Sequence, residues 1–260
     1  MTGQASCTNA SAGYYVDTNA STAQTPCDAG TYNPNSSSNS STDCLTTPAG
    51  NYSGIGASSP TQCSPGTWQN QTGQSACNES EAGHYTDSTA SLQQSECLAG
   101  TYQPLTGQFS CLNASAGHYV ETSGSAVQQP CPSGHYNPDI GADSLSDCLP
   151  ADPGWYVGIN GSTSQTPCAL GTYQPNTGQS ACLESDPGYF VASIASTTQS
   201  ACPAGTYNPS MSSDSGVDCL PADSGNYVDV QASPSQTPCS PGTYQPDLGQ
   251  VSCPNTEPGH

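Results

Sequence analysis

The spacing of the cysteines constrains this chain more than any other feature. The 260 residues contain 15 cysteines, and successive separations alternate between a spacer of 19 or 20 residues and a loop of 14 or 17 residues. Strict alternation at a fixed period indicates a repeat architecture. One spacer and one loop together form a repeat of 33, 34 or 37 residues. No residue in the sequence indicates a particular reaction.

The alternation predicts seven repeats between two partial ones. The tail of a truncated repeat occupies residues 1–7, and the start of a further truncated repeat occupies residues 254–260. The repeats between them comprise residues 8–44, 45–77, 78–111, 112–148, 149–182, 183–219 and 220–253. Because the end of a loop precedes the first repeat and the start of a spacer follows the last, we expect a piece of a longer repetitive chain.

The composition indicates that disulfide cross-links, and not a hydrophobic core, stabilise the fold. Leu, Ile, Val, Phe and Met together make up about a tenth of the residues, which is too few for a core of ordinary size. Such a composition usually means disorder, because too little apolar surface is buried to offset chain entropy. Disulfides, each contributing roughly 2–4 kcal/mol, replace the missing core in small cysteine-rich modules.

Each spacer and each loop carries the motif Gly-x-aromatic. The rings in the spacers are Tyr15, Tyr52, Tyr85, Tyr119, Tyr156, Phe190 and Tyr227, and those in the loops are Tyr32, Trp68, Tyr102, Tyr136, Tyr173, Tyr207 and Tyr244. We expect the glycine to allow a turn or a close backbone approach and the ring to cover the neighbouring disulfide. Within a loop, strands are expected at Thr-Tyr-Gln before the turn, as at 172–174, and at Gln-Ser after it, as at 179–180.

No period of 3.6 appears, and Gly, Pro, Ser, Thr and Asn interrupt every window, which argues against helices. The predicted fold is small, disulfide-rich, and mainly β or irregular. It is an elongated tandem-repeat rod of two-stranded ribbons with essentially no helix.

Two regular schemes of cysteine pairing are open, together with an interlocked pattern across repeats, because spacing alone does not fix connectivity. Pairing across the loops leaves Cys7 single, and pairing across the spacers leaves Cys253 single. We favour the loops, because a hairpin brings their ends together at little entropic cost.

The loop Cys168–Cys182, with its Cys-x-x-Gly-Thr-Tyr start, resembles the first disulfide loop of tumour-necrosis-factor-receptor (TNFR-like) modules. It is also similar to ephrin-receptor-like and growth-factor-receptor cysteine-rich repeats, although the Cys-x-x-Cys doublet usual in those families is missing here. The resemblance implies that the two cysteines of each loop pair. The implied bonds are Cys27–Cys44, Cys63–Cys77, Cys97–Cys111, Cys131–Cys148, Cys168–Cys182, Cys202–Cys219 and Cys239–Cys253, with Cys7 unpaired within this chain.

Cysteine use and glycosylation sequons both predict an extracellular or cell-surface location in an oxidising compartment. The acceptors in Asn-x-Ser/Thr sequons are Asn9, Asn19, Asn35, Asn39, Asn51, Asn70, Asn78, Asn113 and Asn160. With no Lys or Arg and a net charge of −20, binding to nucleic acid is not expected. No apolar run is long enough for membrane insertion in this segment.

No arrangement typical of an enzyme is visible, and we expect no catalytic residue and no required cofactor. His84 and His118 fill the variable position of Gly-x-Tyr, His135 replaces the usual threonine, and His260 ends the sequence. We expect these histidines on the surface, because the position varies between repeats. A weak calcium site is conceivable at Asp139, Asp143 and Asp147, which recur at steps of four. Turn and capping roles are favoured for these carboxylates and for Asp43 and Asp218.

Two functions are compatible with these features. The first is a secreted, glycosylated, disulfide-stapled structural protein that forms an extracellular fibre, stalk or surface filament, whose partners are other copies of itself, or a continuation of the same chain, and glycans. The alternative is a ligand-binding or adhesive cysteine-rich ectodomain of a receptor or adhesin. In that case exposed aromatic residues such as Trp68, Phe109 and Trp155 would form the binding surface.

Overall fold

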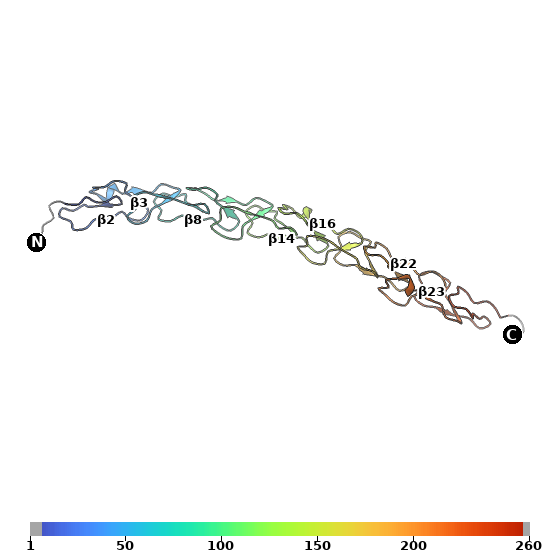
Figure 1. Cartoon of the computed structure of the whole chain (residues 1–260). Helices are drawn as coiled ribbons and strands as arrows, with labels where there is room; N and C mark the ends of the chain where they lie inside the picture. Colours follow the sequence, from blue (N-terminus) through green and yellow to red (C-terminus); the bar gives the residue numbers. More distant parts are fainter. Residues whose placement is uncertain (1–6, 257–260) are drawn as a thin grey trace. The chain divides into compact units, whose positions relative to one another are not determined.

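The computed structural model describes residues 7–256, and over this range the prediction of a disulfide-rich, mainly β repeat fold is confirmed. Strands are two residues long and form separate two-stranded antiparallel ribbons. Figure 1 shows these short arrows separated by long stretches of irregular backbone. The described residues contain no α-helix, only single-turn 3-10 helices.

We divide each repeat into a loop half, which runs from one cysteine of a loop to the other, and a spacer half, which is the remainder. The ribbons of the spacer halves are β1 (Tyr14–Tyr15) with β2 (Thr25–Pro26), β5 (Asn51–Tyr52) with β6 (Thr61–Gln62), β9 (His84–Tyr85) with β10 (Ser95–Glu96), β13 (His118–Tyr119) with β14 (Gln129–Pro130), β17 (Trp155–Tyr156) with β18 (Thr166–Pro167), β21 (Tyr189–Phe190) with β22 (Ser200–Ala201), and β25 (Asn226–Tyr227) with β26 (Thr237–Pro238).

The ribbons of the loop halves pair a strand that holds the ring with a strand just after the second cysteine. They are β3 (Thr31–Tyr32) with β4 (Leu45–Thr46), β7 (Thr67–Trp68) with β8 (Asn78–Glu79), β11 (Thr101–Tyr102) with β12 (Leu112–Asn113), β15 (His135–Tyr136) with β16 (Leu149–Pro150), β19 (Thr172–Tyr173) with β20 (Leu183–Glu184), and β23 (Thr206–Tyr207) with β24 (Leu220–Pro221). The last loop half has one bridge, between Thr243 and Asn255.

The second strand of each loop ribbon therefore lies later in the chain than the sequence predicted. Residues 179–180 are not in a strand, and Tyr173 pairs with Leu183, beyond Cys182. The first strand, β19, lies inside the disulfide-closed loop, and the second strand, β20, begins directly after the second cysteine.

Single-turn 3-10 helices precede the second cysteine of the long loops, at η1 (Ser41–Asp43), η2 (Leu145–Asp147) and η3 (Gly216–Asp218). Ser40 and Ser215 cap the first and third of these helices. The carboxylates of Asp43 and Asp218 accept hydrogen bonds from the backbone N–H groups of Ser40 and Ser215. This is the reciprocal arrangement of a capping box, and it confirms the capping role expected for these two carboxylates.

By its contacts the chain divides into two compact units. The first comprises Met1–Ser115, Val120–Gln128 and Gly141–Ser144, and the second comprises Ala116–Tyr119, Gln129–Ile140 and Leu145–His260. The same hydrogen-bond pattern recurs inside each unit, and each bond given below joins residues of one unit.

Hydrogen bonds connect each half-repeat to the next through the glycine of its Gly-x-aromatic motif, which we call the lead glycine. Its N–H donates to the carbonyl of the residue three positions after the following lead glycine, at 2.7 to 2.9 Å. The pairs are Gly13–Asn33, Gly30–Ser53, Gly50–Gln69, Gly66–Thr86, Gly83–Gln103, Gly100–Val120, Gly117–Asn137, Gly134–Val157, Gly154–Gln174, Gly171–Val191, Gly188–Asn208, Gly205–Val228 and Gly225–Gln245.

Lead glycines also pack closely against the half-repeat after next, so that spacer contacts spacer and loop contacts loop. Gly83 has φ +83°, and a Cβ there would collide with the carbonyl oxygen of Gly124 in the next spacer half. Gly66 has the same relation to Gly107 in the next loop half. The expectation that these glycines allow a close backbone approach is confirmed.

The buried core is a series of small side chains, not of rings. Fully buried positions include the first cysteine of most loops, such as Cys97, the equivalent small residue of the spacers, such as Ala114, and most residues three positions after a lead glycine, such as Val120 or Asn208. The aromatic rings of the motif are half-buried, except that Tyr244 is classed as exposed, at 49%. The rings contribute partial cover, whereas the closely packed backbone and the disulfides fill the centre.

Candidate functional site

The stapled loops are the most distinctive chemical feature of the described chain. The structure joins Cys27–Cys44, Cys63–Cys77, Cys97–Cys111, Cys131–Cys148, Cys168–Cys182, Cys202–Cys219 and Cys239–Cys253, with Cα–Cα distances of 5.6 to 5.8 Å. These are the pairs across the loops. Cys7 is a free, exposed cysteine within the described chain.

A glutamine amide three positions after the lead glycine, buried in every short loop except the last, organises each short loop. Gln103 is 4% exposed; its Nε2 donates to the carbonyl of Ser110 at 2.8 Å, and its Oε1 accepts from the N–H of Leu105 at 3.2 Å. Gln69, Gln174 and Gln245 make the same two bonds in their own loops. The amide therefore satisfies backbone groups that a loop without regular structure leaves unpaired.

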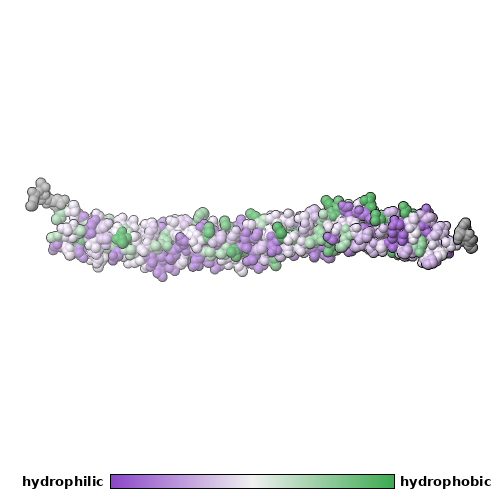
Figure 2. Space-filling model, turned by 90° about the horizontal axis from the view of Figure 1, so that it is seen from below, coloured by the Kyte–Doolittle hydropathy of each residue, from purple (hydrophilic) through white to green (hydrophobic). Residues whose placement is uncertain are grey.

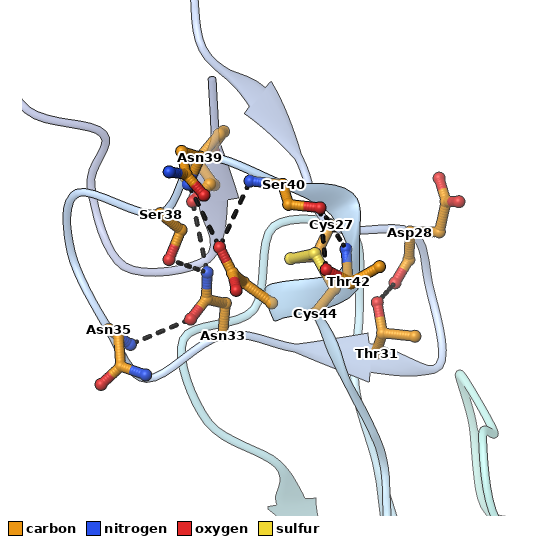
Figure 3. The surroundings of a disulfide bond; sticks show 12 residues. Cys27, Asp28, Thr31, Asn33, Asn35, Ser38, Asn39, Ser40, Thr42 and Cys44 are labelled. Atoms are coloured by element: carbon orange, nitrogen blue, oxygen red, sulfur yellow. Dashed lines mark hydrogen bonds between the residues drawn. A yellow bond between two sulfur atoms is a disulfide. The ribbon is translucent and has the colours of Figure 1, made fainter. Parts of the chain in front are cut away.

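In the long loops asparagine replaces glutamine, and a serine helps to hold it. Asn33 donates from Nδ2 to Ser38 Oγ at 2.7 Å and accepts from the N–H of Asn35 at 3.0 Å (Figure 3). Asn208 makes the equivalent bonds to Ser213 and Ser210. The remaining long loop has alanine at the serine position, at residue 142, and Asn137 Nδ2 there is buried without a hydrogen-bond partner.

The spacer halves carry a noncovalent counterpart of the disulfide. When spacers and loops are aligned on their lead glycines, a glutamine occupies the position of the second cysteine of a short loop. Its Oε1 accepts from the N–H two residues before the lead glycine, at 2.6 to 2.8 Å. The bonds run from the N–H groups of Ser11, Glu81, Ser115, Asp152, Asp186 and Asp223 to Gln24, Gln94, Gln128, Gln165, Gln199 and Gln236.

The first cysteine has its own counterpart in the spacers, where a small residue is buried at the same position. These residues are Ala10, Thr47, Ser80, Ala114, Ala151, Ser185 and Ala222.

We call the hydrogen bond from the N–H two residues before the lead glycine to the spacer glutamine the glutamine clamp. It was missed from the sequence, although the alignment of glutamine under cysteine was the signal that could have revealed it.

One spacer lacks the clamp, and its sequence explains why. In repeat 45–77 the residue two positions before lead glycine Gly50 is Pro48, which has no N–H to donate. The same spacer has one residue fewer than the others and no glutamine at the clamp position. Donor and acceptor are therefore absent together.

Eight of the sequon asparagines are exposed, and one is not. Asn9, Asn19, Asn35, Asn39, Asn70, Asn78, Asn113 and Asn160 have exposed residues in the structure. Asn51 is half-buried in β5, and its Nδ2 donates to the carbonyl of Ala49 at 3.0 Å. Glycosylation itself stays a prediction, and the surface geometry favours it at the exposed sites.

The titratable residues of the described chain do not gather into a metal-binding group. Within residues 7–256 no group of three or more His, Cys, Asp or Glu side chains is placed to hold a metal ion. Calcium binding by Asp139, Asp143 and Asp147 therefore stays an untested prediction. His84, His118 and His135 are half-buried, not on the open surface, and His260 lies outside the described residues.

The aromatic side chains expected to be exposed divide into two groups. Trp68 and Trp155 are half-buried in ribbons, where Trp155 faces Pro167 across the strands. Phe109 is 62% exposed, and Leu98 and Leu105 of the same loop are 72% and 61% exposed. On the face in Figure 2, hydrophobic residues appear as small areas separated by hydrophilic ones.

The part of the chain that the structure describes contains no helix long and apolar enough to cross a membrane. Disulfides in each complete loop are typical of an extracellular or otherwise oxidising compartment.

Comparison with known proteins identifies the type of repeat. No curated protein matches the chain. Residues 50–97 and 154–202 match the family described as tyrosine-protein kinase ephrin type A/B receptor-like. Each stretch begins at a lead glycine of a spacer and ends at the first cysteine of a loop. The resemblance predicted from the Cys-x-x-Gly-Thr-Tyr loop is therefore confirmed, and over these two stretches the chain carries cysteine-rich repeats similar to those of ephrin-type receptors.

Proposed function

We propose that this chain is a secreted, glycosylated structural repeat protein that forms an extracellular fibre, stalk or surface filament. The observation that carries the proposal is the recurrence of one hydrogen-bond pattern, from Gly13 to Gly225, through half-repeats that differ mainly in how they are closed. Chains of equivalent units that contact their near neighbours suit an extended scaffold. Its partners are further copies or a longer run of the same repeats.

The surface chemistry supports an exposed, long-lived role. Exposed sequons on many repeats would carry a sugar coat. The absence of Lys and Arg denies trypsin-like proteases a cleavage site. A net charge of −20 with no positive side chain favours solubility over nonspecific binding to anionic surfaces.

Electron microscopy of native material tests this role. Regular fibres or filaments, labelled along their length by an antibody against the repeats, are expected. Compact, monodisperse monomers that the antibody labels singly would contradict it.

The second candidate is a ligand-binding or adhesive ectodomain, and two observations favour it. The matched family is of the receptor type, and the loop Cys97–Cys111 presents Leu98, Leu105 and Phe109 to solvent. The equivalent positions of loop 63–77 are Ser64, Gln71 and Ser75. Exposed apolar side chains concentrated on one loop are a feature of interaction surfaces.

Substitution separates the two candidates. Cell-adhesion or ligand-capture assays should be repeated with Phe109→Ser and Leu105→Gln, which copy the polar loop, and with Ser180→Ala as the control. Loss of binding restricted to the first two variants would favour the ectodomain. Unchanged behaviour of all three, with filaments intact, would favour the structural role.

A further inference from the structure

Each repeat except 45–77 is closed twice, once in its loop by a disulfide and once in its spacer by a glutamine hydrogen bond. In a short loop such as Cys97–Cys111 the closure is a disulfide. In the following spacer the buried Ala114 and the half-buried Gln128 stand at the positions equivalent to Cys97 and Cys111. Gln128 Oε1 accepts a hydrogen bond from the N–H of Ser115 at 2.7 Å. The two closures differ greatly in the tension that they can resist, because a hydrogen bond to an exposed backbone group exchanges readily with water.

We propose that the spacer halves are the extensible elements of this chain and that the loop halves are its inextensible stops. The proposal rests on the structural role proposed above, since a fibre or stalk is a chain that is placed under tension. Under load the glutamine clamps and the bonds of the lead glycines open, and the spacer straightens. The disulfides hold the ends of each loop at 5.6 to 5.8 Å, so the loop residues add no length.

The cysteine positions fix how far the chain can extend. About 20 residues lie between the second cysteine of one loop and the first of the next, so a straightened spacer spans about 70 Å. The loops withhold 14 or 17 residues each. Reduction of all seven disulfides should therefore lengthen the fully stretched chain by roughly 330 Å.

The spacer of repeat 45–77 should yield before the others. Pro48 leaves it without the clamp donor, and no glutamine stands at the clamp position. Its remaining closures are backbone bonds, such as that from the N–H of Cys63 to the carbonyl of Gly50 at 2.9 Å. The same bonds are present in the clamped spacers, so the missing clamp is the difference that matters.

Single-molecule stretching of the whole glycosylated chain, held by tags at its two ends, tests the proposal. The decisive variant is Ala114→Cys with Gln128→Cys, oxidised with glutathione disulfide, which places two thiols fourteen residues apart as in a short loop. Each new disulfide forms from two thiols, and one glutathione disulfide is reduced to two glutathiones. We expect this bond to form and the fully stretched length to fall by about 45 Å.

Gln128→Ala alone is the matched control, because it removes the clamp without adding a bond. It should leave the stretched length unchanged and lower the force at which the spacer of repeat 112–148 opens. The same low force is expected from the native spacer of repeat 45–77, and a Pro48→Ser variant should not raise it without an added glutamine.

Two results would overturn the inference. One is failure of the 114–128 disulfide to form in a folded chain, since the two closures would then not be equivalent. The other is a native chain that extends to the same length with and without reductant. Absence of fibres in micrographs would remove the proposed structural role but would leave these lengths as predicted, so the two failures are distinguishable.

Discussion

At the scale of single residues, the backbone of this chain depends on the lead glycines. The lead glycines have positive φ, and a Cβ would collide with the backbone of the half-repeat after next at most of them. The sequence predicted a special role for these glycines from the Gly-x-aromatic motif alone. It could not show which segment they contact, because that segment lies two half-repeats further along the chain.

A substitution separates this role from general glycine flexibility. We expect Gly83→Ala to lower the free energy of unfolding by more than about 2 kcal/mol, since it adds the strain of a left-handed alanine to a backbone collision. Gly54→Ala is the control: its Cβ would meet nothing within 4 Å and its φ is not positive. The free energies of unfolding of the two variants, measured by denaturant titration, should differ clearly. Equal values would contradict the close approach of the backbone at Gly83.

The buried glutamines of the short loops give a second prediction. Gln103→Ala leaves the N–H of Leu105 and the carbonyl of Ser110 without their partner, and an unpaired buried polar group costs about 1–3 kcal/mol. Gln93, which is exposed, should tolerate the same change within about 0.5 kcal/mol. Thermal unfolding of both variants measures the difference in stability. A Gln103→Ala variant as stable as the native protein would show that water can replace the hydrogen bonds of the Gln103 amide.

Glycan occupancy should follow the exposure of the acceptor side chain. Asn51 is held by a hydrogen bond to Ala49 within a ribbon, whereas Asn70 is exposed outside one. We therefore expect Asn70 to carry glycan and Asn51 to remain largely unmodified in protein from a glycosylating host. Site-specific mass spectrometry after enzymatic deglycosylation in heavy-oxygen water reports both, and full occupancy at Asn51 with none at Asn70 would contradict the expectation.

At the scale of the elements, alternating closures organise the half-repeats. Short ribbons and the lack of α-helix in residues 7–256 were predictable, because the sequence has no apolar period of 3.6 and Gly, Pro, Ser, Thr and Asn interrupt every window. The position of the second strand was not predictable, because the pairing of Tyr173 with Leu183 depends on the path of the chain after the disulfide-bonded Cys182. The rings, expected to cover each disulfide as a minimal core, are only half-buried, and small side chains and cysteines hold the fully buried positions.

Removal of one disulfide should destabilise the chain only near the affected loop. Replacing Cys168 and Cys182 by serine together removes a disulfide that closes a 14-residue separation, which costs about 3 kcal/mol in the chain-entropy description. Because half-repeats contact only near neighbours, we expect limited proteolysis by a protease that cuts after aromatic residues to cleave near Tyr173 and to spare Tyr32. Uniform cleavage along the variant would show that the chain unfolds as one cooperative body.

At the scale of the whole molecule, the repeat period, the compartment and the resemblance to ephrin-receptor-like repeats follow from the cysteines and the Cys-x-x-Gly-Thr-Tyr loop. The boundaries placed at residues 44, 77, 111, 148, 182 and 219 stay predictions. The glutamine clamp was not foreseen, because its role appears only when a spacer is superposed on a loop. A glutamine in a Ser/Thr-rich segment carries no such meaning by itself.

The account as a whole depends on covalent closure of each loop within itself. Peptide mapping of the native protein without reduction, using a protease other than trypsin because the chain has no Lys or Arg, tests it most directly. The expected result is seven linked pairs, from Cys27–Cys44 to Cys239–Cys253, with no linkage between different loops. Free thiols at these positions, or bonds that join one repeat to another, would contradict the account.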